Sequence, residues 1–196
     1  GASVLRIFSE LEGNQTWAAT RGVSALIEEW RESPCNEAGA RELDAKSSVR
    51  MDSPERFFLS RRSVRDFDAS PVDRDLIRNA IELAIQTPSA CNRQPWTVYF
   101  YDSKDRIESA LRVQNGNRGF GHLVPGLLIA TVDRRAYDNS AERYQHWIDG
   151  GMFSMSLVWA LHALGLVTCC LNWSRDPWED IKGRKVLGIP GYSEIM

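Results

Sequence analysis

Two short segments contain the side chains best suited to bind a ligand. Residues 61–67 read R-R-S-V-R-D-F, so three guanidinium groups and a hydroxyl fall within five positions. Guanidinium groups only donate hydrogen bonds, and their geometry matches a dianionic phosphate. Residues 87–96 read T-P-S-A-C-N-R-Q-P-W, a Pro-Ser turn followed by two side-chain amides and an indole. One predicted helix separates the segments, so together they suit a mononucleotide with a flat, hydrogen-bonding ring.

Each segment taken alone has a simpler interpretation. A run of arginines is typical of a solvated helix end. A Pro-Ser pair followed by Asn is typical of an ordinary turn. The order of the segments and their positions at the two ends of one helix are what favour a binding site.

The helix between the two segments is predicted from its apolar stripe. Asp73 is its N-cap, and Thr87-Pro88 ends it, because the residue before a proline disfavours helical backbone. The stripe consists of Leu76, Ile77, Ala80, Ile81, Ala84 and Ile85.

Further elements are expected along the chain from periodicity, capping residues and apolar runs. The predicted helices lie at 23–31, from Pro54 up to the arginines, and over 103–112, 144–164 and 177–187. The predicted strands lie over 97–101, 127–132 and 166–172, and another begins near 192. Helices and strands alternate loosely, which indicates an α+β or α/β protein.

Composition and charge limit the classes of binding partner, cellular compartment and metal site that the chain can have. The chain has 196 residues, enough for one domain with a core, and a net charge of −2. That charge argues against a nucleic-acid partner, because binding to a phosphate backbone needs a basic excess. The four cysteines are Cys35, Cys91, Cys169 and Cys170. They fit neither a secreted disulfide framework nor a zinc site, so we predict free thiols, a cytoplasmic location and no metal.

A stretch at 152–171 contains no Lys, Arg, Asp or Glu and is long enough to span a bilayer. Polar residues are spread along it, and Gly165 interrupts it. A buried helix followed by a buried strand therefore fits better than a membrane span. A helix that is apolar on nearly every side must be covered all round, which suggests burial at a domain centre or a subunit interface.

From Ser53 onward the chain resembles the nitroreductase superfamily of flavin mononucleotide (FMN) enzymes. The resemblance rests on the two segments above and on G-G-M-F-S-M-S-L-V-W-A-L-H-A-L-G-L-V-T at 150–168. It implies an α+β fold, a mixed sheet with helices on both faces, and an intertwined homodimer with the long apolar helix at its centre.

The resemblance also implies a set of cofactor-binding residues. Arg61 and Ser63, with Arg62 close by, would hold the phosphate and ribityl oxygens of FMN. Arg65 would approach the pyrimidine edge of the flavin and tune it, and no residue would act as a separate catalytic acid or base. The ring-contacting stretches would be Pro88, Ser89 and Asn92 in the turn, and Leu171 and Asn172 after the long helix.

The domain boundaries follow from the extent of the resemblance. Residues 1–50 form an N-terminal extension of unknown role, and 53–196 form the FMN-binding domain. Family members continue beyond the point matched by Met196 with a strand, a Gly-Tyr-Pro-like turn and a basic residue that completes the phosphate clamp. The domain is therefore expected to be truncated, and losing one such contact costs about 1.5–3 kcal/mol.

The implied activity is transfer of electrons from NAD(P)H through FMN to a small nitroaromatic, quinone or similar acceptor, in a two-step exchange. Reductive dehalogenases and flavin-cleaving relatives share the arginine-serine motif and are alternatives within this class. A non-catalytic flavin- or nucleotide-binding domain is the alternative outside it.

Overall fold

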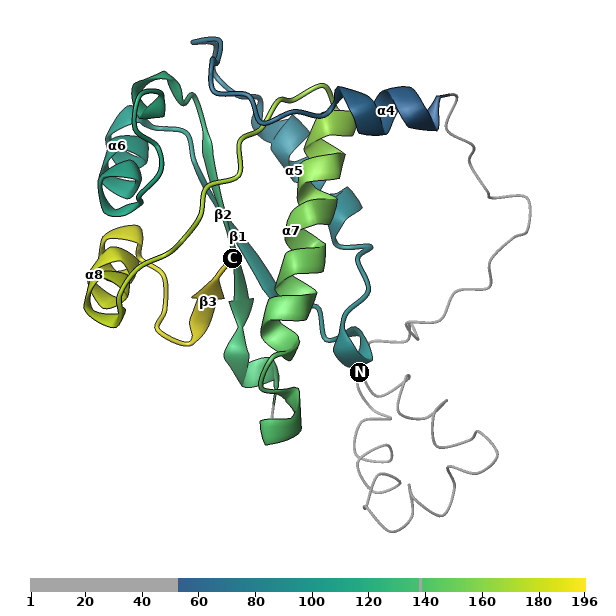
Figure 1. The fold of residues 1–196 in the computed structure, drawn as a ribbon, viewed down its shortest axis with the longest axis vertical. Coiled ribbons are helices and arrows are strands. Elements are labelled where there is room, and N and C mark those ends of the chain that lie inside the picture. Colours follow the sequence, from purple (N-terminus) through teal and green to yellow (C-terminus); the bar gives the residue numbers. More distant parts are fainter. Residues whose placement is uncertain (1–52, 138) are drawn as a thin grey trace. The chain divides into compact units, whose positions relative to one another are not determined.

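A three-stranded antiparallel sheet organises the part of the chain described by this computed structural model, residues 53–137 and 139–196. The helix predicted at 23–31 and the whole N-terminal extension lie outside these residues. The strands are β1 (Trp96–Tyr101), β2 (Leu127–Asp133) and β3 (Ser193–Ile195), in the order β1-β2-β3 (Figure 1). All three lie close to their predicted positions.

Five α-helices and several 3₁₀ turns accompany these strands in the described residues. The α-helices are α4 (Pro54–Ser60), α5 (Arg74–Ala84), α6 (Lys104–Val113), α7 (Gln145–Ala163) and α8 (Pro177–Leu187). The 3₁₀ turns are η2 (Ala90–Asn92), η3 (Gly121–Leu123), η4 (Arg134–Ala136) and η5 (Ser140–Glu142).

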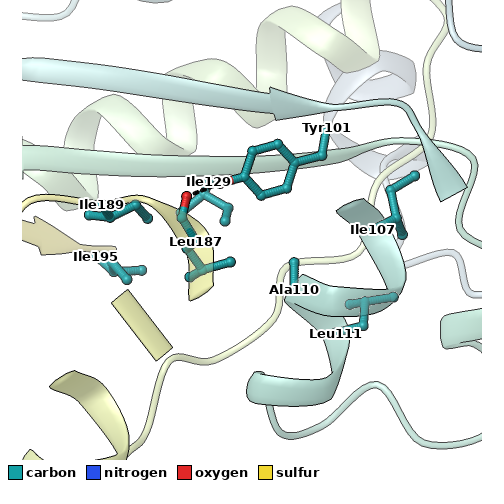
Figure 2. Packing of buried hydrophobic residues seen from close by; sticks show 8 residues of the cluster. All are labelled: Tyr101, Ile107, Ala110, Leu111, Ile129, Leu187, Ile189 and Ile195. Atoms are coloured by element: carbon teal, nitrogen blue, oxygen red, sulfur yellow. Dashed lines mark hydrogen bonds between the residues drawn. The ribbon is translucent and has the colours of Figure 1, made fainter. Parts of the chain in front are cut away.

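The sheet has a hydrophobic cluster on each face, because successive side chains of a strand point to opposite faces. On β1, Val98 and Phe100 pack with α5 and α7, whereas Tyr99 and Tyr101 pack with α6 and α8. Figure 2 shows the cluster on the α6 and α8 side of the sheet, in which the Tyr101 hydroxyl donates to the Leu187 carbonyl oxygen at 2.5 Å. Helices on both faces, as the resemblance implies, are confirmed.

Local capping signals explain where two of the helices begin. The Asp73 carboxylate accepts a hydrogen bond from the Asp75 amide at the start of α5, as predicted from the sequence. At α8, Asp176 accepts from the amides of Trp178 and Glu179, which confirms the predicted last helix. That helix ends at Gly188, whose φ of 69° is left-handed and suits glycine.

The long helix α7 is buried on one side only. Asp149, Phe153 and Leu157 are among its buried residues, and they face the interior of the described body. Its exposed large apolar residues are Trp147, Ile148, Met152 and Met155. No helix in the described ranges is long and apolar enough to cross a membrane.

The segment after α7 differs from the prediction. A strand was expected over 166–172, but these residues form no strand and make a single parallel bridge, between Thr168 and Ser63. The described strands themselves pair only antiparallel, so this bridge is the parallel element among the described residues. Strand assignment needs a continuous partner, and pairing over more than 100 residues of sequence cannot be read from local pattern.

Candidate functional site

The arginine segment is joined to the segment that follows α7. It leaves the end of α4, and the Val64 amide donates to the Thr168 carbonyl oxygen at 3.0 Å beside the Ser63–Thr168 bridge. The predicted groups at 61–65 and 171–172 are thereby held on neighbouring stretches of chain.

A cavity of about 300 Å³ lies between these two stretches. Three predicted site residues, Arg65, Leu171 and Asn172, line it together. The other lining residues are Asn115, Gly116, Cys169 and Cys170. The residues that line the cavity thus include one with a guanidinium group and two with side-chain amides.

The remaining residues of the arginine segment lie beside this cavity. Arg61 is half-buried, and its guanidinium carbon lies 5.9 Å from the centre of the Trp159 ring. Arg62 and Ser63 are exposed, and Arg62 donates to the Arg61 carbonyl oxygen at 2.8 Å. Of the four predicted residues in this segment, Arg65 lines the cavity, and Arg61, Arg62 and Ser63 lie just before it in the chain.

The charge of Arg61 also reaches the cavity wall. Burial raises the pKa of the Cys170 thiol, the neighbouring Cys169 raises it further, and the positive charge of Arg61 works against both. A raised pKa favours the protonated, neutral form of this thiol at neutral pH.

A histidine anchors the start of the arginine segment. The His162 Nε2 atom, on α7, lies 2.9 Å from the Ser60 hydroxyl and 3.1 Å from the Phe57 carbonyl oxygen. These contacts hold the last turn of α4 against α7 and so fix where residues 61–65 begin.

The Pro-Ser turn is built at the other end of α5. Pro88 and Ser89 follow the helix, and the Ser89 hydroxyl accepts from the Gln94 amide at 3.0 Å. The Ala90 amide donates to Asp149 near the start of α7 at 3.1 Å. Asn92 lies in η2 with a left-handed φ of 52°.

Within a single chain, the Pro-Ser turn does not lie at the cavity. The turn contacts α7 at Asp149, whereas α4 contacts the same helix at His162. These residues are 13 positions apart, which is roughly 20 Å along a helix axis. The placement of the two motifs at opposite ends of α5 agrees with the sequence prediction, but Pro88 and Ser89 do not line the cavity.

Sequence reasoning did not assign the loop at Asn115 and Gly116 to the site. It is held against the segment after α7, because Gln114 donates to the Asn172 carbonyl oxygen at 2.8 Å and Asn115 donates to that of Ser174 at 3.0 Å. Gly116 has a φ of 100°, a conformation that favours glycine. The Asn-Gly pair was a visible turn signal, but nothing local indicated which segment the loop would meet.

A second, apolar cavity of about 430 Å³ adjoins the first through Cys169, Cys170 and Leu171. Its walls include aromatic and aliphatic side chains from α7, β2 and the segment after α7. The Ser154 hydroxyl lines this cavity and has no hydrogen-bond partner in the described part of the chain. Within those same residues no cluster of His, Cys, Asp and Glu could hold a metal ion.

Two curated proteins are similar to this chain over part of its length. A 4-nitrobenzoate reductase of Nocardioides sp. (strain LMS-CY) is 26% identical over 186 residues, which covers 69% of this chain and 74% of that protein. An NADH dehydrogenase of Thermus thermophilus is 39% identical over 56 residues, which covers 29% of this chain and only 23% of that protein.

Solved structures share the fold at low sequence identity. An FMN-dependent nitroreductase of Clostridium difficile R20291 has a TM-score of 0.60 at 20% identity, covering 71% of this chain and 80% of that one. A nitroreductase family protein of Clostridium novyi NT has a TM-score of 0.63 at 18% identity, covering 71% and 78%. The profile of the Nitroreductase family matches residues 59–196, which contain all the predicted site residues. The chain therefore belongs to the nitroreductase family.

Proposed function

We propose that this chain is an oxidoreductase that uses FMN, takes electrons from NAD(P)H, and passes them to a small nitroaromatic, quinone or similar acceptor. The observation that supports this most directly is the cavity in which Arg65, Asn115 and Asn172 meet. Family membership supports the reaction class. The identity of the acceptor and the preference for NADH or NADPH are parts of the proposal.

The side chains present fit FMN chemically. The phosphate is a dianion, and the chain places Arg61 and Arg62 on the segment that leads to the cavity. The flavin ring has hydrogen-bonding edges, and Arg65, Asn115 and Asn172 supply a guanidinium group and two amides. Among the described residues no carboxylate lines this cavity, so an anion would meet no like charge from these walls.

The residues of the arginine segment would then divide between two roles. Arg61, Arg62 and Ser63 would hold the phosphate and ribityl oxygens, and Arg65 would face the pyrimidine edge of the ring. When bound, FMN supplies the hydride and electron chemistry. A fixed positive charge at Arg65 favours the negative charge that this edge gains on reduction. The backbone of Leu171 and Asn172 would border the ring.

The exposed face of α7 supports a homodimer. Trp147, Ile148, Met152 and Met155 are each 39–52% exposed and lie at helical spacing on one side of the helix. A twofold axis that lies at this face and perpendicular to α7 would run the two α7 helices antiparallel. The Pro88–Ser89 turn sits at the N-terminal end of α7 and the cavity near its C-terminal end. Antiparallel pairing would bring the turn of each copy toward the cavity of the other.

A cytoplasmic location is part of the same proposal. Cys91, Cys169 and Cys170 are free thiols, which fits a reducing compartment.

Reconstitution with FMN tests the proposed function. The purified full chain should bind FMN and show the visible absorbance of a flavin, and NADH or NADPH should bleach it in the absence of oxygen. Adding a nitroaromatic compound or a quinone should then restore the colour. Binding without bleaching would favour a non-catalytic flavin-binding domain, and failure to bind would contradict the proposal.

A further inference from the structure

A fully buried carboxylate joins three separate stretches of the chain. Asp149, in the second turn of α7, has no exposed surface. Its Oδ2 atom accepts from the Ala90 amide at 3.1 Å and from the Tyr137 hydroxyl at 2.8 Å, and its Oδ1 accepts from Gln145 Nε2 at 2.8 Å. Burial of an acidic group is unfavourable unless donors satisfy it, and here three donors do so.

The turn that Asp149 contacts has unusual backbone. Cys91, Asn92 and Gln94 all have left-handed φ values, of 53°, 52° and 49°. Each such residue other than glycine costs about 1 kcal/mol, so the turn needs bonds that hold it in this form. The Ser89 hydroxyl bonded to the Gln94 amide is one of these, and Asp149 bonded to the Ala90 amide is another.

We propose that Asp149 is a positioning residue for the flavin site. It holds the Ala90 amide and thereby fixes Pro88 and Ser89, the residues proposed to contact the flavin ring. The inference rests on the proposed function for that contact. Asp149 itself lines neither of the two cavities.

The same oxygen atom connects the turn to a second loop. Tyr137 follows η4, and its hydroxyl shares Asp149 Oδ2 with the Ala90 amide. A shift of the turn would therefore change the hydrogen bond between Asp149 and Tyr137. A shift of Tyr137 would likewise change the hydrogen bond between Asp149 and the Ala90 amide. Asp149 couples the proposed flavin-contacting turn to the loop that leads into α7.

Two substitutions separate positioning from general stability. Asp149→Ala removes every acceptor, and amide hydrogen exchange at Ala90 and Gln94 should become about tenfold faster in the protein without FMN. The dissociation constant of FMN should rise by a similar factor. Asp149→Asn keeps one side-chain oxygen for Ala90 and Tyr137, so both quantities should stay within about threefold of the original chain.

Tyr101→Phe is the matched control. It removes a buried hydrogen bond in the cluster on the opposite face of the sheet, so it lowers stability without touching the turn. The exchange rate of its Ala90 amide, taken relative to the amides of β1 and β2, should equal that of the original chain. Its FMN affinity should also equal that of the original chain.

The inference is overturned if Asp149→Ala changes Ala90 exchange no more than Tyr101→Phe does. It is also overturned if Asp149→Asn folds with normal stability but its Ala90 amide exchanges rapidly. This second test still decides the question if the alanine variant fails to fold. Rapid exchange at Ala90 with unchanged FMN affinity would refute the positioning role. Failure of the original chain to bind FMN would instead contradict the proposed function.

Discussion

The Val64 amide donates to the Thr168 carbonyl oxygen at 3.0 Å, next to the parallel bridge between Ser63 and Thr168. This backbone contact sets the distance between the arginine segment and the residues that follow α7. Because backbone groups make it, substitution of the flanking side chains should leave the two segments together. Arg61 and Arg65 can therefore be changed one at a time without dismantling the cavity.

Substituting these two arginines should have different effects on bound FMN. Arg65→Ala should lower the reduction potential of the flavin and slow hydride transfer more than it weakens binding, because charge develops at the ring edge only on reduction. Arg61→Ala should weaken FMN binding by roughly ten- to a hundredfold with little change in potential, because the phosphate is charged throughout. A redox titration and an FMN dissociation constant for each variant measure both quantities.

Arg78→Ala is the control for this pair. Arg78 lies on the exposed side of α5 and pairs with Asp75, away from the cavity. It should change neither quantity. Equal proportional changes in affinity and potential for Arg61→Ala and Arg65→Ala would refute the separate roles.

A charge placed on the exposed face of α7 should dissociate the proposed dimer. Ile148→Glu would place an unpaired carboxylate in an apolar interface, and the dimer dissociation constant should rise at least about tenfold. Ile181→Glu is a matched control, because Ile181 on α8 is 47% exposed and Ile148 is 52% exposed. Sedimentation velocity over micromolar concentrations should show a monomer only for Ile148→Glu. A monomeric original chain would contradict the dimer.

Gly150 packs where no side chain fits. A Cβ atom there would lie 2.8 Å from the Val132 methyl carbon Cγ2 and would also meet the sulfur of Met196. Met196 can rotate away, but Val132 is fully buried on β2. Gly150→Ala should therefore lower the free energy of unfolding by about 1 kcal/mol or more, despite the better helix propensity of alanine.

Urea unfolding checks this, with Gly191→Ala as the control. A Cβ at Gly191 meets nothing within 4 Å, so that variant should change stability by less than about 0.5 kcal/mol. Equal stability of the two variants would show that α7 and β2 can separate at little cost.

Asp180 should make stability depend on pH in acid. Burial raises the pKa of this carboxyl, but hydrogen bonds from Arg184 at 2.6 Å and Trp173 at 2.7 Å outweigh burial and lower it overall. A lowered pKa in the folded state favours the charged form. Its contribution is therefore complete above the ordinary value of about 4 and is lost as the pH falls through the lower folded value.

Asp180→Asn should be less stable than the original chain at neutral pH, and its stability should fall less steeply below about pH 4. Asp102 also has a lowered pKa because Arg74 donates to it, but that pair is exposed to solvent. Asp102→Asn should flatten the curve much less. Unfolding free energies measured from neutral to acidic pH test both variants, and parallel curves for Asp180→Asn and the original chain would contradict the assignment.

The elements that could be predicted from the sequence are those with local signals. The cap at Asp73, the proline after Asp176 and the apolar runs of β1 and β2 each act within a few residues, and α5, α8 and both strands lie where these signals place them. Ser53 and Ser103 stand at the N-cap positions of α4 and α6, but neither side chain makes a capping hydrogen bond. A capping residue type permits the bond without ensuring it.

Features that depend on distant pairing could not be predicted. The single bridge at Thr168 replaces an expected strand, because its partner Ser63 is separated from it by more than 100 residues. Asn115 reaches the cavity for the same kind of reason, through a hydrogen bond to Ser174. Nor could spacing alone have shown that Pro88 and Ser89 lie away from the cavity within one chain, because their position depends on how α5 packs against α7.

The cluster in Figure 2 has a consequence for synthesis on the ribosome. Tyr101, Ile107 and Ile129 are made well before Leu187 and Ile195, which complete the same cluster. The 58 residues from 129 to 187 take roughly 3–12 s to add at the usual rate of translation. For that interval this face of β1 and β2 has α6 but neither α8 nor β3 as an apolar partner on the nascent chain, so the part still uncovered is a natural binding surface for a chaperone.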